Sequence, residues 1–146
     1  MDPQSDRWNI LVVEDNPVDF CMLGLALEDA GLAFDMINIK DGVEAITFVR
    51  NEGEKVCPDL FVIDLHVPRA SGVEVVAAIR RSDSMRHVPV ITMSALASPY
   101  AAETIAATGA ERHIIKPCDL GDFLKIGSTL KESLESYAIA STSPTS

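Results

Sequence analysis

Short apolar runs alternate with stretches in which apolar residues recur at helical spacing. The runs predict strands, and they lie at 8–13, 34–39, 58–68, 88–93 and 111–115. The helical spacing predicts helices from 18 to 30, 43 to 51, 73 to about 82, 98 to 109 and 119 to 134. Five strands that alternate with five helices indicate an α/β protein with a doubly wound parallel sheet and right-handed crossovers.

The third run, Pro58 to Pro68, gives the most information about a site. It is continuous and rich in β-branched and aromatic residues, which is typical of a central strand buried on both faces. Asp64 then lies at the carboxyl end of that strand, where open α/β sheets bind their ligands. A cap or turn role for Asp64 is the alternative, and this run alone does not decide between them.

Polar groups also follow the other strands, and the carboxyl ends of parallel strands meet at one edge of a sheet. Glu14 and Asp15 follow the first strand, Ser94 follows the fourth and Lys116 follows the fifth. Each has an ordinary explanation alone: an acidic turn, a turn serine or a loop lysine. Together they indicate a site, because crowded carboxylates favour a hard cation such as Mg²⁺, and lysine and serine suit phosphoryl oxygens.

Size and charge narrow the class of protein. The 146 residues, 47% of them hydrophobic, suit one folded domain, which we place at 8–137 between a flexible segment 1–7 and a disordered tail 138–146. A net charge of −10 argues against binding to nucleic acid or to an anionic membrane. Without a signal peptide or an apolar span, we expect a cytoplasmic protein. We expect the three cysteines, Cys21, Cys57 and Cys118, to be free and mostly buried.

Four motifs, in order and spacing, resemble the receiver domain of two-component response regulators. They lie at 12–17, at 63–68 with Gly72, at 93–95 and at 115–117, and the likeness extends roughly from 8 to 134. It implies a flavodoxin-like sheet with strand order 2-1-3-4-5, and a single-domain regulator rather than an enzyme. The segment 13–19, Val-Glu-Asp-Asn-Pro-x-Asp, is similar to the single-domain regulators that partner bacterial phytochromes.

The resemblance also implies a role for each candidate site residue. Asp64 would accept a phosphoryl group from the phosphohistidine of a sensor histidine kinase. A bacterial phytochrome is one candidate for this kinase. Ser94 and Lys116 would bind the phosphoryl oxygens. Mg²⁺, with Mn²⁺ as a substitute, would be held by Glu14, Asp15, Asp64 and the backbone carbonyl of His66.

The same resemblance implies how the signal leaves the site. Ser94 would move toward the phosphoryl group, and an aromatic residue would turn inward; here that position holds His113, so a switch role and a plain surface histidine both stay open. His66 and Leu96 would control the access of water. The face formed by the fourth helix, fifth strand and fifth helix would bind a downstream protein, a histidine phosphotransfer protein or a second copy. Candidate apolar residues there are Ile105, Ile114, Ile126 and Tyr137, and core packing is the commoner role for each.

Other functions fit the sequence less well. A Mg²⁺-dependent aspartyl-phosphate phosphatase or phosphotransferase acting on small molecules typically has a second acid two residues after the nucleophile. That position here is His66, and we see no cap domain. A receiver-like module without phosphorylation is disfavoured because every site group is present. A flavin-binding sheet is disfavoured because Glu14 and Asp15 would repel the flavin phosphate.

Overall fold

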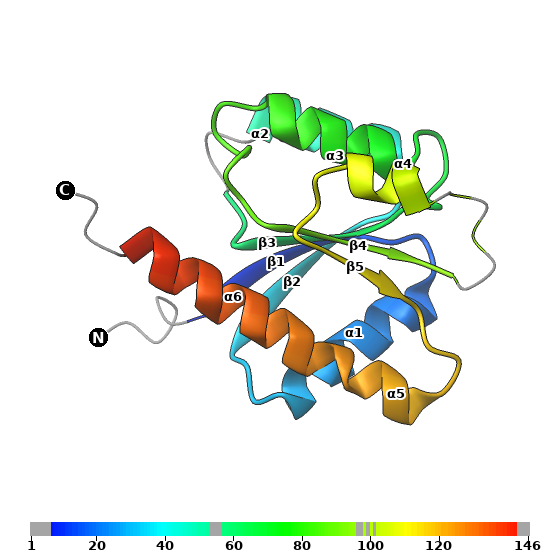
Figure 1. The fold of residues 1–146 in the computed structure, drawn as a ribbon, viewed down its shortest axis with the longest axis vertical. Coiled ribbons are helices and arrows are strands. Elements are labelled where there is room, and N and C mark those ends of the chain that lie inside the picture. Colours follow the sequence, from blue (N-terminus) through cyan, green and yellow to red (C-terminus); the bar gives the residue numbers. More distant parts are fainter. Residues whose placement is uncertain (1–6, 53–56, 96–97, 99, 101, 143–146) are drawn as a thin grey trace.

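The computed structural model describes residues 7–52, 57–95, 98, 100 and 102–142. Its centre is a parallel sheet with the strand order β2-β1-β3-β4-β5, as predicted (Figure 1). The strands are β1 (Trp8–Val13), β2 (Phe34–Ile39), β3 (Leu60–Asp64), β4 (Val90–Ser94) and β5 (Arg112–Ile115). Every residue of β3 and β4 is buried, which is why these strands read as continuous apolar runs.

The helices follow the predicted order with changes near the C-terminus. They are α1 (Pro17–Asp29), α2 (Gly42–Glu52), α3 (Gly72–Arg81), α4 (Ala102–Ala107), α5 (Leu120–Leu124) and α6 (Ile126–Thr142). The predicted last helix is therefore two helices with Lys125 between them. α6 also continues past residue 137, where we expected the domain to end, whereas 1–6 and 143–146 lie outside the described residues.

The fourth helix begins later than predicted. We expected it to start at Ser98 and Pro99, yet Ser98 precedes α4 and Pro99 is not among the described residues. Ser98 has a different role, because its Oγ accepts a hydrogen bond from the backbone N–H of Tyr100 at 3.2 Å. α4 has no buried residue, so tertiary packing does little to fix its length.

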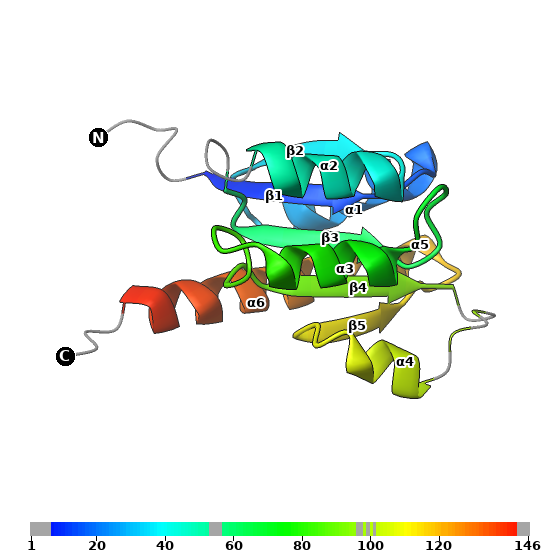
Figure 2. The ribbon, with the colours of Figure 1, turned by 90° about the horizontal axis from the view of Figure 1, so that it is seen from above.

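Two helical layers cover the two faces of the sheet. α2 and α3 lie on one face, and α1, α5 and α6 lie on the other (Figures 1 and 2). Alternate residues of β1 divide between the layers: Leu11 and Val13 pack with α2 and α3, and Ile10 and Val12 pack with α1, α5 and α6. The carboxyl ends of all five strands lie at one edge of the sheet, and the ligand sites of such folds are found at this edge.

Short-range sequence signals fix the ends of α1. The Asn16 side chain caps its start, since Oδ1 accepts hydrogen bonds from the N–H groups of Val18 and Asp19, and Pro17 occupies the first helical position. Gly31 follows the helix with φ of +79°, a conformation that favours glycine. α1 is therefore held at both ends by residues that suit those positions.

α1 is also packed closely against α6. A Cβ at Gly127 would lie 1.9 Å from the carbonyl oxygen of Ala26, so this approach needs a glycine. Leu23 and Leu27 of α1 join Phe123 and Leu130 in the same buried cluster. The first turn of α1, which faces the carboxyl edge of the sheet, thus stands on a firmly packed helix.

The structure decides some open questions about exposure and corrects one expectation. Ile126 is 4% exposed and belongs to the core, so it cannot contribute to a docking face, and Ile114 packs against the same core. The cysteines are free, as expected, but all three are exposed rather than buried. Large apolar side chains that do reach the surface are Val18, Leu25, Ile37, Val43, Ile115 and Leu120. None of the helices in the described part of the chain combines the length and hydrophobicity needed to cross a bilayer.

Candidate phosphoryl site at the carboxyl edge of the sheet

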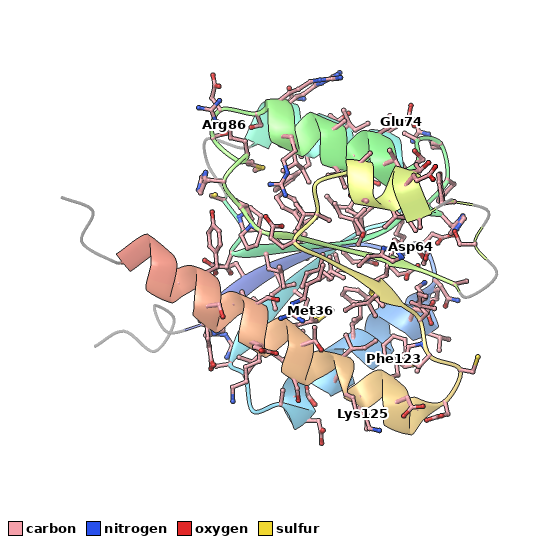
Figure 3. The ribbon with its side chains drawn as sticks, viewed as in Figure 1. Met36, Asp64, Glu74, Arg86, Phe123 and Lys125 are labelled. Carbon is pink, nitrogen blue, oxygen red and sulfur yellow. The ribbon has the colours of Figure 1, made fainter. Side chains whose placement is uncertain are left out.

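The predicted site residues meet at the carboxyl edge of the sheet. Asp64 is the last residue of β3 and lies between the two helical layers (Figure 3). Glu14 and Asp15 follow β1 directly, Ser94 ends β4, and Lys116 follows β5. The parallel topology therefore brings together groups that are as many as 102 positions apart in the sequence.

The Lys116 ammonium is the centre of the acidic pocket. Its Nζ donates hydrogen bonds to Glu14 Oε1 at 2.7 Å, to Asp64 Oδ2 at 2.7 Å and to Asp19 Oδ2 at 2.8 Å. An ammonium has three N–H groups, so all of them are used. Asp19, in the first turn of α1, was not predicted as a partner of Lys116.

Hydrogen bonds fix the Asp64 carboxylate, and close packing fixes the turn that follows it. The backbone N–H of His66 donates to Asp64 Oδ1 at 2.8 Å, which leaves Oδ2 to Lys116. The start of α3 packs directly behind this turn, since a Cβ at Gly72 would lie 2.6 Å from the backbone oxygen of Asp64. Gly72 therefore allows α3 to lie close to the backbone of this turn, and the two hydrogen bonds orient the Asp64 carboxylate.

Burial and hydrogen bonding shift the pKa values of the pocket in different directions. Burial raises the pKa of Glu14 to about 7, aided by the nearby charge of Asp64 and opposed by the hydrogen bond from Lys116. Burial also acts to raise the pKa of Asp64, but the hydrogen bonds from Lys116 and from His66 N–H outweigh it and lower that pKa. For Lys116, hydrogen bonds to three carboxylates outweigh burial and raise the pKa. The pKa of Asp64 is therefore held low, whereas that of Glu14 is raised toward neutrality.

Three of the acids suit a hard divalent cation. One carboxylate oxygen from each of Glu14, Asp15 and Asp64 can be chosen so that all three lie within 4.8 Å of one another. Glu14 and Asp64 are buried, whereas Asp15 is exposed at the rim. Oxygen ligands from two or three carboxylates, with room for water on the exposed side, are what Mg²⁺ favours, and Mn²⁺ accepts similar ligands. This part of the edge is an acidic metal site.

Ser94 lies in a second hydrogen-bonded group beside the acids. Its Oγ is 2.8 Å from His113 Nε2, and Thr92 Oγ1 is 2.7 Å from His113 Nδ1. Thr92 and Ser94 are buried, two residues apart on β4, and His113 on β5 bridges them. Neutral imidazole can serve both hydroxyl groups, one as donor and one as acceptor, and burial lowers the pKa of His113, which favours this neutral form.

Replacing His113 by phenylalanine is expected to change how the free energy of unfolding depends on pH. The pKa of His113 is lower in the folded protein than its ordinary value of 6.5, so the unfolded chain binds more protons just below pH 6.5. The stability that neutral His113 provides is present above pH 6.5 and is lost as the pH falls through the folded pKa. Urea unfolding near pH 7.5 and pH 5.5 should show that the wild type loses stability relative to His113→Phe as the pH falls, because every other titrating group is present in both proteins.

The exposed His87 supplies the matched control for that measurement. His87→Phe removes an imidazole but leaves the Thr92–His113–Ser94 contacts in place. If the free energies of unfolding of the wild type and of His113→Phe changed by the same amount between the two pH values, His113 would not be the group that titrates.

The side chain of His66 joins two loops at the rim of the site. His66 Nε2 is 2.9 Å from Ser98 Oγ, and its ring lies 5.1 Å from that of Tyr100, tilted by 47°. Leu96, which we expected to act together with His66, lies outside the described residues. Four residues that contact site residues were not predicted from the sequence: Asp19, Thr92, Ser98 and Tyr100. Each contact joins side chains from different elements, and no sequence motif records such a contact.

Comparisons with known proteins agree with this geometry. The family model described as the response regulator receiver domain matches residues 10–126. The polar-differentiation response regulator DivK of Brucella anthropi is 30% identical over 129 residues, which cover 88% of this chain and 94% of DivK. Nearly the full length of this relative is therefore matched.

Two solved structures share the fold. The phosphorylated cyanobacterial phytochrome response regulator RcpA has a TM-score of 0.78 and 25% identity, over 89% of this chain and 95% of that chain. The Mn²⁺-bound response regulator Rcp1 has a TM-score of 0.74 and 23% identity, over 86% and 92% of the two chains. Because the family model spans residues 10–126 and DivK matches over nearly its full length, the chain belongs to the response regulator receiver domain family, a signalling module rather than a conventional enzyme.

Proposed function

We propose that this receiver accepts a phosphoryl group on Asp64 from the phosphohistidine of a sensor histidine kinase. The observation that carries the proposal is the position of the Asp64 carboxylate, buried at the carboxyl edge of the sheet and 2.7 Å from the Lys116 ammonium. Phosphoryl transfer depends mainly on positioning and on neutralising charge, and both are available around this carboxylate.

The transfer makes one bond and breaks one. An Asp64 oxygen attacks phosphorus as the P–N bond to the donor imidazole breaks, and the electron pair stays on the imidazole nitrogen. Lys116 Nζ and Ser94 Oγ donate hydrogen bonds to phosphoryl oxygens. Glu14, Asp15, Asp64 and the backbone carbonyl of His66 would hold Mg²⁺, or Mn²⁺ in its place. The bound cation would offset the negative charge of the phosphoryl oxygens.

Ser94 and His113 would connect phosphorylation to the surface. Ser94 Oγ can donate to a phosphoryl oxygen only if it gives up or shares its contact with His113 Nε2, so the two residues form the proposed switch. His113 lies on β5, which forms the proposed output face together with α4 and with α5 and α6, the two parts of the predicted fifth helix. A downstream protein, a histidine phosphotransfer protein or a second copy of the chain would bind there.

The kinase and the compartment are part of the same proposal. RcpA is a phytochrome response regulator by its description, so a bacterial phytochrome is one candidate sensor kinase for this chain. We place this receiver in the cytoplasm, together with the phosphohistidine of its kinase. The formal charge of −10 also favours a protein partner over nucleic acid or an anionic membrane.

Intact-mass measurement after incubation with acetyl phosphate tests the proposal. The wild type should gain one phosphoryl group only when Mg²⁺ is present, and Asp64→Asn should gain none. Asp59→Asn is the matched control and should gain one, because Asp59 precedes the opposite end of β3, where it accepts a hydrogen bond from Asn9 N–H. A wild type that gains no phosphoryl group under these conditions would overturn the proposal.

The alternative, a phosphatase or phosphotransferase acting on small molecules, has a different outcome. It would release phosphate from sugar phosphates over many turnovers. His66 is a poor general acid for it, since the ring is committed to Ser98 and Tyr100 rather than placed as a second carboxylate would be.

A further inference from the structure

Asp19 is the partner of Lys116 that stands apart from the metal site. Its carboxylate accepts a 2.8 Å hydrogen bond from Lys116 Nζ, but it is not among the acids grouped closely enough to share an ion, which are Glu14, Asp15 and Asp64. Its side chain is 22% exposed, against 2% for Glu14 and 8% for Asp64. Asp19 is therefore partly hydrated and has a contact that neither the cation nor the phosphoryl group requires.

The backbone of Asp19 is fixed independently of Lys116. The Asn16 cap accepts a hydrogen bond from Asp19 N–H at 3.4 Å, and α1 is packed against α6 at Gly127. Lys116, by contrast, lies in the connection between β5 and α5, and its side chain must reach across β4 and β3 to Glu14. A long, flexible side chain needs fixed acceptors if its ammonium is to stay in one place.

We propose that Asp19 is a positioning residue that keeps hold of Lys116 during phosphoryl transfer. The inference rests on the proposed function of Asp64. In the free protein the ammonium is shared by Glu14, Asp19 and Asp64. When Asp64 is phosphorylated, the N–H that faced it passes to a phosphoryl oxygen, and Glu14 is engaged with the cation. Asp19 is the acceptor that takes part in neither event. It therefore fixes the ammonium while the N–H that faced Asp64 changes partner.

Two substitutions separate position from charge. Asp19→Ala removes both the carboxylate charge and the hydrogen-bond acceptor, whereas Asp19→Asn removes the charge and keeps an acceptor oxygen of the same reach. The matched control is Asp29→Asn, which removes a negative charge from the exposed last residue of the same helix, about 15 Å along its axis from Asp19.

The first readout is the rate of phosphorylation by acetyl phosphate, below saturation and with Mg²⁺. We expect Asp19→Ala to lower the rate about tenfold, the effect of losing one charge-assisted hydrogen bond. Asp19→Asn should lower it about threefold, because a neutral acceptor keeps a weaker bond, and Asp29→Asn should leave it unchanged. Mg²⁺ affinity, measured by calorimetry, should fall equally in Asp19→Ala and Asp19→Asn, since both remove the same charge.

The second readout follows Lys116 itself. In ¹⁵N-lysine-labelled protein, a hydrogen-bonded ammonium exchanges slowly enough with water to give a signal, which Lys116→Arg would assign. The Lys116 signal should persist in the wild type when Mg²⁺ and beryllofluoride, a phosphoryl mimic, are added. It should be lost in Asp19→Ala and kept in Asp19→Asn.

The outcomes distinguish this inference from the proposed function. If the wild type is phosphorylated on Asp64 and Asp19→Ala reacts at the same rate, the positioning role is wrong and the proposed function stands. If Asp19→Ala and Asp19→Asn lowered the rate of phosphorylation by the same factor, the effect would come from charge alone, and this would also overturn the positioning role. A wild type that is never phosphorylated overturns the proposed function, and with it the inference.

Discussion

Replacing Lys116 by methionine is expected to lower the free energy of unfolding of the metal-free protein by about 3 kcal/mol at pH 8. Methionine keeps an apolar stem of similar length and removes the ammonium. The buried Glu14 and Asp64 then lose their counter-charge, so each must stay an unpaired anion or take up a proton, and either change costs stability. The expected cost is at the lower end for breaking a buried ion pair, because the third partner, Asp19, is partly exposed. Urea unfolding in EDTA measures it.

An exposed lysine gives the matched control. Lys125 donates to Asp122 at 3.1 Å, but the two side chains are 79% and 55% exposed, so Lys125→Met is expected to change stability by less than about 1 kcal/mol. Saturating Mg²⁺ should return part of the stability of Lys116→Met, since the cation supplies positive charge to the same carboxylates. A Lys116→Met protein as stable as the wild type in EDTA would show that the pocket does not depend on Lys116.

The sheet could be predicted from the sequence because its strands carry a strong local signal. β1 and β2 have the predicted bounds, and β3 is buried throughout, as its continuous apolar run indicated. The edge position expected for β2 is also confirmed. α1, whose ends are marked by Asn16, Pro17 and Gly31, lies within one residue of its predicted bounds at each end.

The weakly packed elements were predicted less well. α4 has no buried residue, so hydrophobic periodicity hardly constrains its start. The separation of α5 from α6 at Lys125 leaves the apolar stripe unbroken, and a stripe is all that periodicity detects. Ile126 was a candidate for the docking face with core packing as the alternative, and its contacts with the cluster that holds Phe123 and Leu130 place it in the core.

The site residues likewise form two groups, those that could be predicted from the sequence and those that could not. Residues at strand ends could be predicted, because parallel topology alone brings Glu14, Asp64 and Lys116 to one edge. Partners that depend on side-chain reach could not. Asp19 stands within the motif 13–19 and in the first turn of a helix, yet nothing in the sequence says that Lys116 extends to it. The bridge from His113 to Thr92 likewise depends on the register of β4 and β5.

The metal-free protein is expected to gain about 2 kcal/mol of stability from Glu14 as the pH falls from 8 to 5.5. The pKa of Glu14 is raised from 4.5 to about 7 in the folded protein, mainly by burial. Between these two values the folded protein binds more protons than the unfolded chain, so acidification favours folding. The contribution is therefore fully present below pH 4.5 and is lost as the pH rises through about 7.

Glu14→Gln isolates this effect, because glutamine has the shape of the protonated acid and does not titrate. In EDTA the variant should be more stable than the wild type at pH 8, and the difference should shrink toward pH 5.5. His113 acts in the opposite direction below pH 6.5, but it is present in both proteins and cancels from the difference. Saturating Mg²⁺ should weaken the dependence, since it binds ionised Glu14. If Glu14→Gln instead followed the wild type at every pH, the proton taken up on folding would belong to another group, and the crowded carboxylates would not be what limits the stability of the metal-free receiver.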